Sequence, residues 1–134
     1  KLVLSKIKEM CGNEPVILTG DFNVDQTHQS YAVLNTSGIL DDSYEKANIR
    51  YALNGTFNGF KPDLYTNSRI DHIFVSPVMT VERYGILTDT YRTVRDANGK
   101  IKAGDFPEEY SFKDCDIRMP SDHFPVVVKL SLKK

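Results

Sequence analysis

Three short stretches of this chain place acidic groups, an amide and a histidine where predicted strands meet loops. They are Gly20-Asp21-Phe22-Asn23, Ile70-Asp71-His72 and Ser121-Asp122-His123. Ligands of open α/β sheets bind at strand ends, so polar clusters at such positions indicate a site. Asp71 lies in an otherwise apolar strand, and a buried carboxylate there needs a partner. A histidine is the natural partner, because a carboxylate on one ring nitrogen fixes the tautomer and stabilises the imidazolium form.

Each stretch also has a purely structural interpretation. Asp21 and Asn23 fit an Asx turn after a strand as well as they fit a binding site. A single histidine such as His123 is more often a hydrogen-bonded core residue, and Asp122-His123 also suits a turn that leads into the last strand. On the residues alone, both interpretations stay open.

Helical and strand patterns alternate around these stretches, which is typical of an α/β protein. Residues 1–11 follow a helical period, and the apolar run at 16–20 predicts a strand covered on both faces. Other expected elements are a helix at 30–38, a loop-rich segment around a cleft at 45–69, and strands at 69–76, 80–94 and 125–132. Asn98-Gly99 predicts a hairpin turn between 91–96 and 100–103. No repeat or linker divides the chain into domains.

The composition is that of a globular protein, with 40% apolar and 26% charged residues over 134 positions. A net charge of -1 argues against a dedicated nucleic-acid-binding protein, although a bound metal ion can supply positive charge at a phosphate site. Cys11 and Cys115 match neither a zinc ribbon nor a disulfide framework, so we expect two unpaired thiols. No run reaches the roughly 18 apolar residues of a membrane span, and the sequence assigns no compartment.

In this order, the motifs resemble the endonuclease/exonuclease/phosphatase superfamily, the DNase I-like metal-dependent phosphoesterases. The resemblance covers nearly the whole chain from Pro15 onward. It is carried by Gly20-Asp21-Phe22-Asn23, Thr56-Phe57, Arg69-Ile70-Asp71-His72-Ile73-Phe74 and Ser121-Asp122-His123-Phe124-Pro125-Val126. The fold that it implies is a four-layer α/β sandwich, in which two mixed, mostly antiparallel sheets pack face to face with helices outside. Residues 1–134 would be the C-terminal portion of a single domain of this kind.

The resemblance implies four catalytic residues. Asp21 would orient or deprotonate the attacking water, and Asn23 would hold a non-bridging phosphate oxygen through its amide. His123 would contact the scissile phosphate, either stabilising charge or acting as an acid, while Asp71 holds its ring. A geometric test follows, because the Asp71 carboxylate must lie next to the His123 ring.

The resemblance also implies a metal ion and a substrate groove. Asp122 would help to bind a divalent cation, Mg²⁺ or Mn²⁺, which commonly takes only one or two protein carboxylates and keeps several waters. Thr56, Phe57 and Arg69 would contact the substrate, although ordinary loop packing suits Phe57 almost equally well. The chain has no Trp and lacks the Trp-Cys-Asp-Arg stretch of the inositol-polyphosphate phosphatases, which makes that branch less favoured.

The family's N-terminal half supplies an Asn and the principal metal-binding Glu, and neither has a counterpart in this chain. We therefore expect the chain to belong beside a missing N-terminal half, and to be weakly active or inactive by itself. The predicted function is a metal-dependent phosphoester hydrolase, either a phosphodiesterase or nuclease or a phosphatase, that uses in-line attack of water. The predicted binding partner is a phosphate-ester substrate, and the net charge of the chain does not indicate that this substrate is a nucleic acid. The alternative is a non-catalytic binding domain on the same scaffold. Such a domain would have no chemical need for all five polar residues at once, namely Asp21, Asn23, Asp71, Asp122 and His123.

Overall fold

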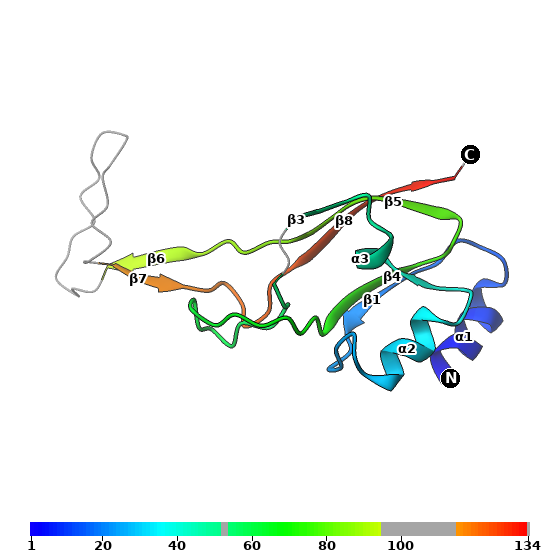
Figure 1. The fold of residues 1–134 in the computed structure, drawn as a ribbon, viewed down its shortest axis with the longest axis horizontal. Coiled ribbons are helices and arrows are strands. Elements are labelled where there is room, and N and C mark those ends of the chain that lie inside the picture. Colours follow the sequence, from blue (N-terminus) through cyan, green and yellow to red (C-terminus); the bar gives the residue numbers. More distant parts are fainter. Residues whose placement is uncertain (52–53, 95–114, 134) are drawn as a thin grey trace.

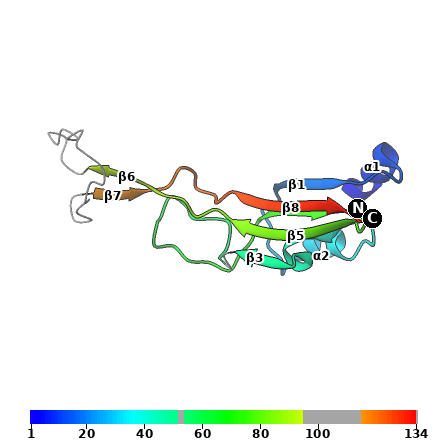
Figure 2. The same ribbon diagram turned by 90° about the horizontal axis from the view of Figure 1, so that it is seen from above.

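Two three-stranded sheets and three helices form the body of the chain, whose computed structural model describes residues 1–51, 54–94 and 115–133 (Figure 1). The helices are α1 (Leu2–Cys11), α2 (Gln29–Asn35) and α3 (Ser43–Lys46). The strands are β1 (Ile17–Asp21), β2 (Asp41–Asp42), β3 (Ile49–Tyr51), β4 (Asp71–Val75), β5 (Met79–Ile86), β6 (Tyr91–Val94), β7 (Cys115–Arg118) and β8 (Val126–Leu132). A ribbon formed by β6 and β7 extends away from this body (Figures 1 and 2).

The first sheet has the order β1-β4-β2, and both pairings in it are antiparallel. Its register places Asp21 directly opposite Asp71 at one end of the sheet. The second sheet has the order β3-β5-β8, with β3 parallel and β8 antiparallel to β5. Strand β8 begins three residues after His123, and the His123 side chain contacts Asp71 at the start of β4, at that end of the first sheet.

Two apolar cores hold these layers together, and β4 contributes to both. Phe74 packs with α2 and with side chains of α1 on one side of the first sheet. Ile73 and Val75 pack with β5 and β8 on the other side. Because successive side chains of a strand point to opposite faces, Asp71 shares the side of Ile73 and His72 shares the side of Phe74. The side chains of Asp71 and His72, although adjacent in β4, therefore lie on opposite faces of the first sheet.

The predicted helices at 1–11 and 30–38 and the predicted strands at 69–76 and 125–132 are confirmed within a few residues. The prediction that the first strand is covered on both faces is wrong for the described residues. There four of the five residues of β1 are exposed, and Ile17 is 51% exposed. The loop-rich segment at 45–69 contains the end of α3 and all of β3. Strand β6 pairs with β7, and the Asn98-Gly99 turn with its partner at 100–103 lies outside the described residues.

The mixed α/β class is confirmed, while the four-layer arrangement stays a prediction. Cys11 and Cys115 are both unpaired, as expected, and Cys115 is buried. Among the helices of the described residues, none has the length and apolar character that a membrane crossing requires.

Candidate active site

His123 and Asp71 form a hydrogen-bonded pair between the turn before β8 and the start of β4. The His123 Nδ1 atom lies 2.8 Å from Asp71 Oδ2, and both side chains are partly exposed. A carboxylate only accepts hydrogen bonds, so Nδ1 carries the proton and donates it, which leaves Nε2 for a ligand. This hydrogen bond, supported by the charges of Asp71, Asp21 and Asp122, raises the pKa of His123 above its ordinary value. The predicted contact between these two residues is therefore present.

Asp21 completes a cluster with this pair. The possible ligand atoms of Asp21, Asp71 and His123 all lie within 4.8 Å of one another. Asn23 follows in a left-handed conformation with a φ of 51°, which Asn tolerates better than most residues, and its N–H donates to Asp21 Oδ1 over 2.8 Å. The Asx turn considered from the sequence is thus present, and both Asp21 and Asn23 are exposed.

Thr56 is the point at which the middle loop is fixed to β4. Its side chain is fully buried, and Oγ1 accepts hydrogen bonds from the N–H groups of Ile70 at 2.9 Å and Asp71 at 3.1 Å. Gly55 makes this possible, since a Cβ there would clash with the Ser68 backbone oxygen. Thr56 therefore acts on the position of Asp71, and its buried hydroxyl is not placed to contact a substrate.

The same loop also holds the turn that carries His123. Phe57 and His123 form an isolated antiparallel bridge, and Phe124 N–H donates to the Thr56 carbonyl over 2.7 Å. The N–H groups of Asn58 and Gly59 donate to the Asp122 carbonyl. The Phe57 ring lies edge-on to the His123 ring with centroids 5.2 Å apart, and it is 39% exposed. Phe57 therefore packs against the His123 ring while remaining partly exposed, and its substrate contact stays a prediction.

The carboxylates supply the donors that a hard divalent cation requires. Mg²⁺ and Mn²⁺ prefer carboxylate and water oxygens, and the side chains of Asp21 and Asp122 offer them at the end of the first sheet and in the turn before β8. Asp122 is partly buried and lies outside the cluster of Asp21, Asp71 and His123. Its carboxylate accepts a long, 3.4 Å hydrogen bond from the Ser121 hydroxyl. The donor set therefore fits such an ion without fixing the geometry of its binding.

Arg69 does not join this cluster. Its side chain is buried, with Nη1 2.9 Å from Asp42 Oδ2, and its guanidinium lies 3.7 Å from the centroid of the Tyr44 ring. Burial lowers the pKa of Arg69, but the Asp42 carboxylate outweighs this effect and raises it above the ordinary value. The predicted substrate contact of Arg69 is thus replaced by an internal ion pair, because its charge is already neutralised in the core.

Asp42 is a residue that the sequence analysis missed. It accepts a hydrogen bond from the Tyr31 hydroxyl at 2.7 Å and caps α3 by accepting from Tyr44 N–H at 2.9 Å. The signal was available as an N-cap pattern, in which an Asp precedes a short helix with Glu45 in its first turn. The pattern predicts the cap but not the ion pair with Arg69.

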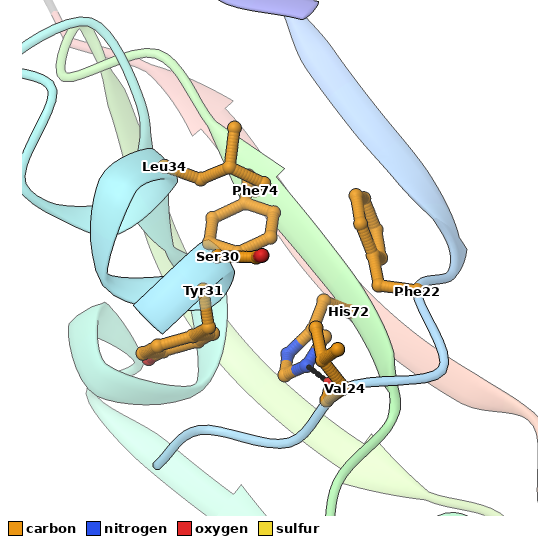
Figure 3. Close-up of a pocket in the computed structure, with 7 residues that line it drawn as sticks. All are labelled: Phe22, Val24, Ser30, Tyr31, Leu34, His72 and Phe74. Carbon is orange, nitrogen blue, oxygen red and sulfur yellow. Dashed lines mark hydrogen bonds between the residues drawn. The ribbon is translucent and has the colours of Figure 1, made fainter. Parts of the chain in front are cut away.

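His72 lies on the opposite side of β4 and borders a cavity of about 110 Å³ beneath α2 (Figure 3). Its Nε2–H donates to the Val24 carbonyl over 3.0 Å, so the ring holds the loop that follows Asn23. Its Nδ1 atom is buried and has no hydrogen-bond partner among the described residues. Burial lowers the pKa of His72 below its ordinary value, which keeps the ring neutral. The sequence analysis assigned this residue no role of its own.

Comparison with known proteins agrees with this arrangement. The model of the endonuclease/exonuclease/phosphatase family matches residues 5–123. A mannosyl-6-phosphatase structure from Bacteroides thetaiotaomicron VPI-5482 is 55% identical over 98% of this chain and 43% of its own, with a TM-score of 0.81. No curated protein matches the chain at the significance that we required.

Two further structures carry the name of the same family. One, from Bacteroides thetaiotaomicron, is 56% identical over 96% of this chain and 42% of its own, with a TM-score of 0.80. The other, from Bacteroides vulgatus, is 26% identical over 98% of this chain and 42% of its own, with a TM-score of 0.67. The chain therefore spans less than half the length of the structures that it matches.

Proposed function

Because the chain belongs to the endonuclease/exonuclease/phosphatase family, we propose that it carries part of the active site of a divalent-metal-dependent phosphoester hydrolase. The observation that carries this proposal is the 2.8 Å contact between His123 and Asp71, with Asp21 within 4.8 Å. A solvent-accessible histidine oriented by a carboxylate, beside a second exposed carboxylate, is suited to proton transfer and to binding of a phosphoryl group.

In the proposed mechanism, the exposed Asp21 carboxylate orients the attacking water and accepts its proton. His123 presents Nε2–H to the phosphoryl group, where a cationic ring stabilises the negative charge that develops and gives its proton to the ester oxygen as the bond from phosphorus to that oxygen breaks. The raised pKa of His123 favours the cationic form of the ring, and Asp71 keeps the ring in one orientation. Asn23 offers its side-chain amide to a non-bridging oxygen. General acid–base catalysis of this kind contributes roughly 10²–10⁴ in rate.

The metal ion would be held in part by Asp122, whose carboxylate is the kind of oxygen donor that Mg²⁺ and Mn²⁺ prefer. When bound, such an ion neutralises phosphate charge and acts as a Lewis acid on a phosphoryl oxygen. We also propose that residues 1–134 form the C-terminal portion of one domain, and that the chain by itself is weakly active or inactive. The 43% share of the mannosyl-6-phosphatase structure that it covers supports this expectation.

The proposed substrate class is a phosphomonoester of a sugar. The support is the 55% identity to a structure named as a mannosyl-6-phosphatase, which extends over 98% of this chain. A net charge of -1 agrees with a small substrate better than with a long nucleic acid, whose binding draws on several phosphate contacts from Lys and Arg.

The test is an assay of the full-length protein with p-nitrophenyl phosphate, bis-p-nitrophenyl phosphate and plasmid DNA, with Mg²⁺ and with EDTA. We expect Mg²⁺-dependent turnover of the monoester, loss of that turnover in EDTA, and a fall of about 10²–10⁴ in kcat for His123→Ala. His28→Asn is the matched control, because Asn is also a good N-cap and can replace the His28 side chain that caps α2. Unchanged turnover in His123→Ala would remove His123 from the active site. Absence of turnover with all three substrates would favour a non-catalytic binding domain.

A further inference from the structure

A second pocket is lined in part by the turn that carries His123. We propose that it binds the uncharged, hydroxylated group of the substrate, a single sugar ring, with the Asp89 carboxylate accepting hydrogen bonds from the ring hydroxyls. This inference rests on the proposed phosphomonoesterase function and adds a residue that sets its specificity. Asp89 does not belong to the motifs of the sequence analysis, although part of the pocket wall comes from the last of them, Ser121 to Val126.

The pocket has a volume of about 100 Å³ and lies between the connection from β5 to β6 and the turn before β8. Leu87, Met119 and Pro125 contribute apolar wall, while Asp89 and His123 contribute polar groups. Leu87 N–H donates to the Pro125 carbonyl over 2.9 Å, which fixes the two segments to each other. Because His123 is itself one of the lining residues, a phosphate held by His123 would lie close to this pocket.

The lining of the pocket matches the chemistry of a sugar. A sugar ring presents C–H groups on its faces and hydroxyl groups around its edge, so it suits apolar walls that contain a few polar groups. An ionised carboxylate only accepts hydrogen bonds, and hydroxyl groups donate them. Asp89 is exposed, so its carboxylate is accessible to such hydroxyls from solvent. Hydrogen bonds to a charged acceptor are the stronger kind.

The charge of the pocket disfavours phosphoesters that carry a second phosphate group. Among the described residues that line it there is no Lys or Arg, and Asp89 carries a negative charge. A second phosphate next to the scissile one, as in nucleic acids or inositol polyphosphates, would meet like charge there. The volume of about 100 Å³ is smaller than the roughly 150 Å³ cavity that holds a benzene molecule, so the pocket would enclose only one edge of a sugar ring and leave the rest in solvent.

The experiment measures kcat/KM of the full-length protein for mannose 6-phosphate and for p-nitrophenyl phosphate, in Mg²⁺. The measured quantity is the ratio of the two values, because p-nitrophenol offers no ring hydroxyls to Asp89. For Asp89→Ala we expect this ratio to fall by about tenfold to a hundredfold, mainly through KM for the sugar phosphate. Glu9→Gln is the matched control, since it removes one exposed carboxylate on α1, and it should leave the ratio unchanged.

A second variant tests the charge argument. Asp89→Lys is expected to raise kcat/KM for glucose 1,6-bisphosphate relative to mannose 6-phosphate, because the second phosphate then meets a cation. If the ratios in both Asp89 variants stay within twofold of the wild-type values, the inference is wrong, even though p-nitrophenyl phosphate is hydrolysed. If the wild-type protein hydrolyses neither monoester, the proposed function itself fails. The two failures are thus distinguishable.

Discussion

Replacing Arg69 by Met is expected to destabilise the fold without directly altering the chemistry of the site. The substitution removes the cation of a buried ion pair and leaves the Asp42 carboxylate in the core, where its exposed fraction is 1%. Breaking a buried pair from one side generally costs about 3–5 kcal/mol, because an uncompensated charge remains buried. The Met side chain has a similar length, so most of the apolar packing of the Arg stem is retained.

The contacts of Asp42 place the expected loss in the lower part of that range. The carboxylate still accepts hydrogen bonds from the Tyr31 hydroxyl at 2.7 Å and from Tyr44 N–H at 2.9 Å. The guanidinium also lies 3.7 Å from the centroid of the Tyr44 ring, and that cation–π contact is lost with it. We therefore expect a decrease of about 3 kcal/mol in the free energy of unfolding.

Urea unfolding of the full-length protein measures this loss, and a double-mutant cycle with Asp42→Asn isolates the pair. The double variant should be less destabilised than the sum of the single variants, because Arg69 and Asp42 stabilise each other. Arg83→Met is the matched control, since Arg83 is exposed on β5, and it should change stability by no more than about 0.5 kcal/mol. A loss of stability below about 1 kcal/mol for Arg69→Met, together with a large fall in kcat/KM, would refute this reasoning. It would support instead the prediction from the sequence that Arg69 contacts the substrate.

Three further predictions concern the residues around β4. In a steady-state assay, Asp71→Asn is expected to lower kcat by about 10²–10⁴ with a small change in KM, because the amide no longer fixes the protonated Nδ1 of His123. Asp71→Glu should recover part of this loss in the same assay. Thr56→Val leaves the N–H groups of Ile70 and Asp71 without their acceptor and should cost about 1–3 kcal/mol in urea unfolding, whereas Thr56→Ser, which keeps the hydroxyl, should cost less. His72 has a lowered pKa in the folded state, so the unfolded chain takes up a proton first as the pH falls below about 6.5. In urea unfolding, the wild-type protein should therefore lose more stability between pH 7.5 and pH 5 than His72→Gln does. Equal losses would contradict the lowered pKa of His72 in the folded state.

Local patterns predicted the main elements, and the resemblance predicted the pairing of Asp71 with His123. Asp71 interrupts an apolar strand, so its need for a partner is visible in the sequence, and the partner lies 52 positions away. Arg69 shows where such reasoning stops. It lies two residues before Asp71, and nothing local indicates that its side chain reaches back 27 positions to Asp42 in the core. The role of Thr56 was missed for the same reason, because its hydroxyl acts through backbone groups 14 and 15 positions away.

The dipeptide Asp-His occurs twice in this chain, at 71–72 and at 122–123, and the structure uses the two copies in opposite ways. In β4 the Asp71 side chain reaches the site, while the His72 ring lies on the helix-covered side and holds the loop after Asn23. In the turn before β8 it is the histidine that pairs with Asp71. A shift of one residue in the register of β4 would exchange the environments of Asp71 and His72, leaving a buried carboxylate under α2. Thr56 Oγ1 accepts from two consecutive N–H groups at the start of this strand, so one buried hydroxyl opposes that shift at the end where the candidate site lies.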